Sequence, residues 1–168
     1  MLTRPGVWAW MGVVGAGLVL ALSFVHPGGA VKTMEPKGPL LARAKTDTQV
    51  LATLERSCQD CHSNNTRWPA YSYVAPVSWL LEHDVRSGRK HLNLSQWAEY
   101  GEGGQRHLLS AIARMMEGDQ MPPPAYIFLH PEARLSDSDR QRIIHWARQE
   151  FSRLDAASEA RSAQSSSH

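Results

Sequence analysis

The chain has 168 residues and a formal net charge of +2, from 18 Lys and Arg against 16 Asp and Glu. This balance gives no case for binding nucleic acid, because the basic residues do not gather into one block. When the two terminal stretches described below are left out, the chain has room for one domain of roughly 100 to 120 residues.

The first 26 residues form an apolar segment. Residues 5–25 contain no charged side chain, and this run is close to the about 20 residues that cross a bilayer as a helix. Trp8 and Trp10 lie where interfacial aromatic residues are expected, and Arg4 favours an inside N-terminus with the rest of the chain exported. Gly28-Gly29-Ala30 is an acceptable signal-peptide cleavage site, so a removed leader is the alternative to a transmembrane helix.

Two further stretches are predicted to lie outside the folded domain. Residues 27–39 are rich in Gly and Pro, which predicts a linker. Residues 156–168 are rich in Ser and Ala without an apolar period, which predicts a disordered tail. The domain is therefore expected at residues 40–155.

The apolar spacing within the domain is helical, and the first predicted helix leads into the cysteine motif. Thr46 or Asp47 can cap this helix, whose inward positions then include Val50 and Leu54. It ends at Cys58-Gln59-Asp60-Cys61-His62, which contains both cysteines of the chain. With both cysteines in one short motif, no disulfide framework is expected.

Two cysteines three positions apart, followed directly by histidine, form the attachment pattern of c-type haem. On a short helical segment, Cys58 and Cys61 can add across the two vinyl groups of one haem, and His62 then binds the iron. A redox dithiol or half of a zinc site are the alternatives for the cysteine pair alone. The first needs a βαβ setting and the second another ligand pair at finger-like spacing, and the sequence shows neither. We therefore predict one covalent haem c with His62 as an iron ligand.

A polar loop after the motif contains candidate haem contacts. Residues 63–69 have the composition of a loop. Arg67, Trp68 and Tyr71 are predicted to hydrogen-bond the haem propionates, the arginine as a charge-assisted donor. The alternative for each is an ordinary role, as a solvated arginine or a half-buried ring.

Three more helices are predicted after this loop. Pro76 suits the first turn of a helix that ends near Gly88. The next follows Gly104 and ends at Gly118, and Ser136 caps the last. The positions predicted to face the core are Val77, Leu81, Val85, Leu108, Leu109, Ile112, Ile143, Ala147, Phe151 and Leu154. No stretch shows the two-residue alternation of a strand, so the predicted class is all-α.

Iron held by one histidine has an open face, and Met121 is the predicted sixth ligand. It follows the motif by about 60 residues and begins the stiff run Met121-Pro122-Pro123-Pro124, whose prolines are expected to exclude helix. The same arrangement carries the methionine ligand in small soluble cytochromes c, where a thioether raises the reduction potential. Met115 and Met116 are more simply core residues. The histidines weighed as ligands, each more simply a surface residue, are His83, His91, His107, His130 and His145.

A series of short motifs runs through residues 40–151. They are Cys58-Gln59-Asp60-Cys61-His62-Ser63-Asn64, Thr66, Trp68-Pro69, Tyr71-Ser72, Ala75-Pro76-Val77-Ser78-Trp79, Gly88-Arg89, Leu92-Asn93, Trp97, Met121-Pro122-Pro123, Tyr126, His130-Pro131-Glu132-Ala133 and Leu135-Ser136-Asp137. Together they resemble the bacterial haem-binding domain family, small single-haem proteins usually exported behind a hydrophobic segment. The resemblance implies one covalent haem c, with Cys58, Cys61 and His62 in their usual roles and Met121 as the distal ligand. Pro124 departs from the pattern, where a bulkier, often aromatic residue is expected.

We expect a cytochrome c-like bundle of about four helices around one haem, preceded by a transmembrane helix. The expected function is a membrane-tethered monohaem cytochrome that passes single electrons between exported redox proteins. It would lie in the bacterial inner membrane and face the periplasm, or be periplasmic if the leader is removed. No catalytic pair or phosphate loop is visible, so we do not expect an enzyme. The alternative is a haem-based sensor, or a weak peroxidase with His83 or His91 beside an open iron.

Overall fold

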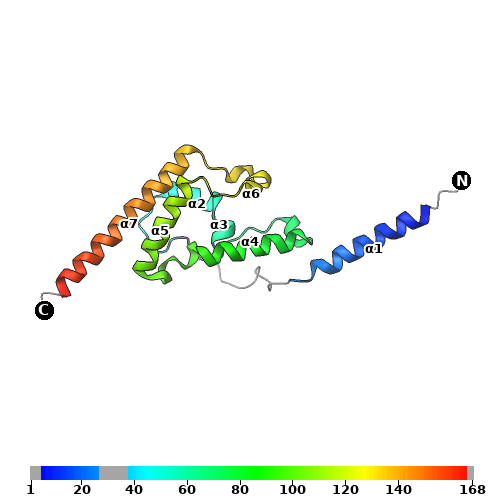
Figure 1. The fold of residues 1–168 in the computed structure, drawn as a ribbon, viewed down its shortest axis with the longest axis horizontal. Helices are drawn as coiled ribbons and strands as arrows, with labels where there is room; N and C mark the ends of the chain where they lie inside the picture. The colour runs from blue at the N-terminus through cyan, green and yellow to red at the C-terminus, as the bar shows by residue number, and fades with distance from the viewer. Residues whose placement is uncertain (1–4, 27–37, 166–168) are drawn as a thin grey trace.

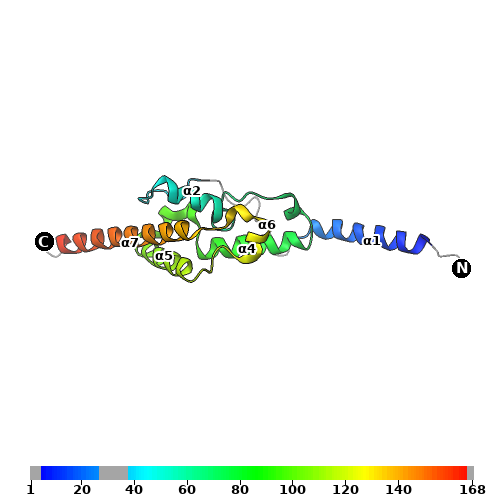
Figure 2. The ribbon, with the colours of Figure 1, turned by 90° about the horizontal axis from the view of Figure 1, so that it is seen from above.

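The computed structural model describes residues 5–26 and 38–165. Within these ranges the chain forms helices and no strand, which confirms the predicted all-α class. The molecule is elongated: α1 projects from one end and the C-terminal part of α7 from the other (Figures 1 and 2). The helices are α1 (Pro5–Ser23), α2 (Thr48–Ser57), α3 (Gln59–His62), η2 (Ala70–Tyr73), α4 (Val77–His91), η3 (Leu94–Tyr100), α5 (Gly101–Glu117), α6 (Pro124–Leu129), η4 (Pro131–Ala133) and α7 (Asp137–Ser165), where η marks a 3₁₀-helix.

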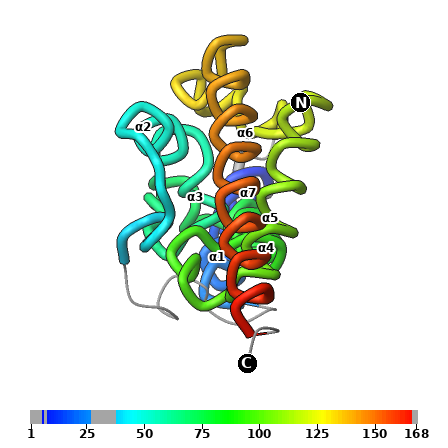
Figure 3. Tube along the Cα trace, turned by 90° about the vertical axis from the view of Figure 1, so that its left-hand side faces the viewer, coloured from blue at the N-terminus to red at the C-terminus, as the bar shows by residue number. Residues whose placement is uncertain are grey.

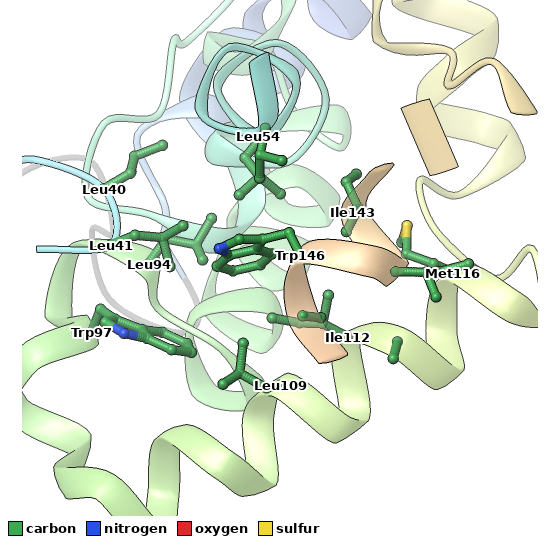
Figure 4. Close-up of a cluster of buried hydrophobic side chains, with 14 of the residues drawn as sticks. Leu40, Leu41, Leu54, Leu94, Trp97, Leu109, Ile112, Met116, Ile143 and Trp146 are labelled. Carbon is green, nitrogen blue, oxygen red and sulfur yellow. The ribbon is translucent and has the colours of Figure 1, made fainter. Parts of the chain in front are cut away.

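The hydrophobic core lies where α2, α5 and α7 meet. Viewed along the long axis, α7 runs between α2 and α5 (Figure 3). Trp146 of α7 lies near the middle of the cluster, with Leu54 of α2 and Ile112 of α5 on either side (Figure 4). Leu40 and Leu41 also belong to this core.

The predicted helix starts are confirmed where a polar side chain caps the helix. Asp47 caps α2, because its carboxylate accepts a hydrogen bond of 2.8 Å from the backbone N–H of Val50. At the start of α7, Ser136 Oγ accepts from the N–H of Asp139, and Asp139 accepts in return from the N–H of Ser136. This reciprocal pair is a capping box.

The predicted buried face of α4 is confirmed at Val85 and wrong at Val77. The buried residues are Ser78, Glu82 and Val85, whereas Val77 is 40% exposed. Glu82 can face inward because His26, just after α1, lies 2.9 Å from its carboxylate. The helix also continues past Gly88 to His91, because its last turn packs against α3.

The predicted N-terminal transmembrane helix is not supported. Helix α1 has 19 residues. Among the described residues, we find no helix with the length and apolar character needed to cross a membrane.

The ends of the predicted domain are only partly described. Most of the predicted linker, residues 27–37, lies outside the described residues. At the other end, α7 continues through Ser165 rather than giving way to a disordered tail at residue 156. Seven of the ten residues at 156–165 are Ala, Glu, Arg or Gln, which favour helix. In addition, Arg161 pairs with Glu102 of α5.

Candidate functional site

The ring of His62 is held by a main-chain carbonyl. His62 ends the short helix α3, and its Nδ1 lies 3.0 Å from the carbonyl oxygen of Leu92. Because a carbonyl only accepts hydrogen bonds, Nδ1 carries the proton and Nε2 the lone pair of the neutral ring. Burial lowers the pKa of His62, which favours this neutral form. His62 is thus in the tautomer that binds iron through Nε2.

The two cysteines are neutral thiols at neutral pH. Neither is in a disulfide. Burial raises the pKa of Cys58 to about 12 and that of Cys61 to about 11. A reactive dithiol has lowered pKa values, so the structure does not support that alternative. The described residues also contain no cluster of three or more metal-binding side chains, so no zinc-type site forms around the pair.

The last turn of α4 packs directly on the motif. A Cβ on Gly88 would lie 2.4 Å from the carbonyl oxygen of Cys61, so only glycine allows this approach. The next residue, Arg89, donates from Nε to the carbonyl of Ser63 and from Nη2 to Thr66 Oγ1, over 2.9 and 3.1 Å. These contacts hold α3 against the helix whose end carries the Leu92 carbonyl.

Asp60, between the two cysteines, is the centre of a hydrogen-bonded group. Its carboxylate accepts from the backbone N–H and Nε of Arg67, from Arg67 Nη2, and from the Tyr126 hydroxyl at 2.8 Å. Thr66 Oγ1 donates to the Asp60 carbonyl over 2.6 Å. We call Asp60, Thr66, Arg67 and Tyr126 the Asp60 cluster. It ties the attachment motif to the following loop and to α6.

Met121 is half-buried in the segment between α5 and α6 and packs against the hydrophobic core that Cys58 and Leu92 also contact. This placement is compatible with an iron ligand, and ligation by Met121 stays a prediction. The expectation that the proline run excludes helix is wrong at Pro124, the first residue of α6. A proline is favoured at a first helical position, where its missing N–H has no partner to lose.

The three predicted propionate contacts lie close together along the chain, Arg67 and Trp68 between α3 and η2 and Tyr71 within η2. Arg67 already bonds Asp60, and the Tyr71 hydroxyl lies 2.5 Å from His130 Nε2. Trp68 is half-buried. Binding of propionates by Arg67, Trp68 and Tyr71 stays a prediction.

The sequence analysis includes Leu92, Asp60 and Gly88 in the family motifs but predicts no role for any of them in the site. Leu92 acts through its backbone, which no residue type reveals. Gly88 did carry a signal, since a glycine inside a helical pattern often marks a close approach.

The family model for the haem-binding domain matches residues 17–149. The chain belongs to the haem-binding domain family. A relative is the cytochrome c peroxidase Ccp of Escherichia coli (strain K12), 30% identical over 95 residues that cover 55% of this chain. The matched part is 20% of that relative, so this chain corresponds to about a fifth of its length. No solved structure matches the chain.

Proposed function

We propose that this member of the haem-binding domain family is a monohaem c-type cytochrome that transfers single electrons between redox partners. The observation that supports it best is the His62 ring, whose Nδ1 is held by the Leu92 carbonyl beside two neutral cysteine thiols. This donor set fits haem c. Cys58 and Cys61 would hold the haem as thioethers and His62 its iron, and the bound haem would supply one-electron chemistry.

The residues around His62 would tune its orientation and basicity as an iron ligand. The Leu92 carbonyl fixes the orientation of the imidazole and increases its basicity, as outer partners of metal-binding histidines do. Gly88 keeps this carbonyl in place by letting α4 approach α3. Met121 is the proposed second iron ligand, and a thioether there would raise the reduction potential.

Absorption spectra of the purified protein test this proposal. We expect a low-spin ferric spectrum with the far-red band of methionine ligation, and no carbon monoxide binding to the reduced protein. Met121→Ala should abolish the band, lower the potential and allow carbon monoxide to bind. Met115→Ala is the matched control, because Met115 is 40% exposed on α5 and is not proposed to bind iron. A protein without covalently bound haem, made in a host able to attach haem c, would contradict the proposal.

A weak peroxidase is the second candidate, and the similarity to a cytochrome c peroxidase favours it. It requires an iron with an open sixth position. A high-spin ferric spectrum, rapid carbon monoxide binding and turnover of hydrogen peroxide by the unmodified protein would support it against the electron carrier.

Export to the periplasm, with or without attachment to the inner membrane, is part of the proposal, and exported redox proteins are the proposed partners. Its support is the uncharged run at residues 5–25 and the fact that c-type haem is attached to exported chains. Protease accessibility in bacteria with a permeabilised outer membrane tests it. Protection of the haem domain from the added protease would contradict it.

A further inference from the structure

The Asp60 cluster joins parts of the chain that are far apart in sequence. Asp60 lies between the two cysteines, and Tyr126 lies in α6, 66 positions further on. Their hydrogen bond of 2.8 Å links α3 directly to α6. Helix α6 follows residues 118–123, the segment that contains Met121, which we call the Met121 loop.

The acceptor in this bond is rigidly placed. Asp60 is only 9% exposed, and three N–H groups of Arg67 also bond its carboxylate at 2.9 to 3.1 Å. Bonds between a guanidinium and a carboxylate are charge-assisted and stronger than neutral ones. The Tyr126 hydroxyl therefore meets a partner that is already oriented by the adjacent loop.

The ring of Tyr126 is also held. It stacks on His130 with a centroid separation of 4.5 Å, and His130 in turn bonds the Tyr71 hydroxyl. Tyr126 lies five positions after Met121, and three of the four intervening residues, Pro122, Pro123 and Pro124, restrict the backbone. Fixing Tyr126 therefore limits where the Met121 side chain can lie.

We propose that Tyr126 is a positioning residue for the sixth iron ligand. Its bond to Asp60 holds the Met121 loop against the attachment motif and favours methionine-bound iron over iron with an open sixth position. This inference rests on the proposed function, in which Met121 binds the iron.

The test is Tyr126→Phe in the haem-loaded full chain, which removes the hydroxyl and keeps the ring that stacks on His130. We expect haem attachment to persist, the far-red methionine band to weaken and the reduction potential to fall. Loss of one hydrogen bond to a charged group should shift the equilibrium towards open iron roughly ten- to hundredfold, seen as faster carbon monoxide binding. Asp60→Asn should act in the same direction.

Tyr73→Phe is the control, because it removes the same hydroxyl from a residue of η2 that is 57% exposed. It should leave the band, the potential and the carbon monoxide rate unchanged. A methionine band in the unmodified protein that persists at full strength in Tyr126→Phe, with the same carbon monoxide rate, overturns the inference alone. An unmodified protein without that band overturns the proposed ligand set, and the inference with it.

Discussion

A main-chain carbonyl orients the proposed iron ligand. His62 Nδ1 bonds the Leu92 carbonyl oxygen, and the backbone of Gly88 lies against that of Cys61. Both contacts depend on the path of α4 rather than on a polar side chain. The absence of a side chain at Gly88 is therefore what allows α4 to lie this close to Cys61.

Gly88→Ala tests whether the close approach of α4 to Cys61 requires glycine at position 88. Inside a helix, replacing glycine by alanine usually stabilises a protein by up to about 1 kcal/mol. At position 88 the new Cβ would lie 2.4 Å from a main-chain oxygen, which has little freedom to move. We expect a loss of about 1–3 kcal/mol in the free energy of unfolding, measured with urea, and a change in the haem spectrum. Gly103→Ala in α5 is the control, since its Cβ would meet no atom within 4 Å. Equal stabilisation by both substitutions would contradict the expected clash.

At the scale of elements, the start of α7 joins two helices. Asp139 bonds the N–H of Ser136 in the capping box and forms an ion pair of 3.0 Å with Arg56 of α2. Partial burial raises the pKa of Asp139, but the hydrogen bonds from Ser136 and the charge of Arg56 outweigh it and hold the pKa below the usual value of 3.8.

Asp139→Asn should therefore reduce stability in a pH-dependent way. A carboxyl group whose pKa is lowered by folding stabilises the protein above its unfolded pKa, and that contribution is lost as the pH falls through the folded value. We expect Asp139→Asn to lower the free energy of unfolding by about 1–2 kcal/mol at pH 7. The difference from the unmodified protein should shrink as the pH falls below 3.8 and vanish once the pH is below the lowered pKa of folded Asp139. Urea unfolding across pH measures it, with Asp137→Asn as the control. A difference that stays constant down to low pH would exclude the carboxylate as its origin.

At the scale of the whole molecule, the end of α1 is docked on the haem-binding domain. The N–H of Ala75 donates to Ser23 Oγ over 3.0 Å, and Trp79 Nε1 donates to the Val25 carbonyl over 2.7 Å. His26 bonds Glu82, whose side chain is 3% exposed. Cleavage after Ala30 would remove all three contacts, so they can form only in a chain that retains its N-terminal segment.

His26→Ala should destabilise the whole domain, because it deprives a buried carboxylate of a hydrogen-bonding partner. With the His26 side chain 33% exposed, we expect a loss of about 1–2 kcal/mol. The same substitution should have less effect in a Glu82→Gln chain, where no charge is left unpaired. Thermal unfolding of the four variants of this cycle measures the coupling, with the exposed His145→Ala as the control. Additive effects would show that the pair contributes no coupling.

Much of the local structure was predictable from the sequence. The cysteine motif, the Asp47 and Ser136 caps and most of the core positions on α5 and α7 depend on residues within a few positions of each other. Helical periodicity and capping chemistry are local, so the residue types alone were enough to identify them.

Tertiary structure alone decided how these pieces form a site. The Leu92 carbonyl faces His62 across 30 positions, Glu82 bonds His26 across 56, and Tyr126 reaches Asp60 across 66. The Leu92 carbonyl belongs to the main chain, so the residue type gives no sign of its role. The buried Glu82 breaks the apolar pattern that located the buried faces of the other helices. The sequence by itself determined the all-α class and the haem-binding domain family, because both depend on residue types and their spacing. The packing of α4 and α6 around the cysteine motif determined which atoms orient His62 and Asp60, because that packing depends on long-range contacts that no local pattern encodes.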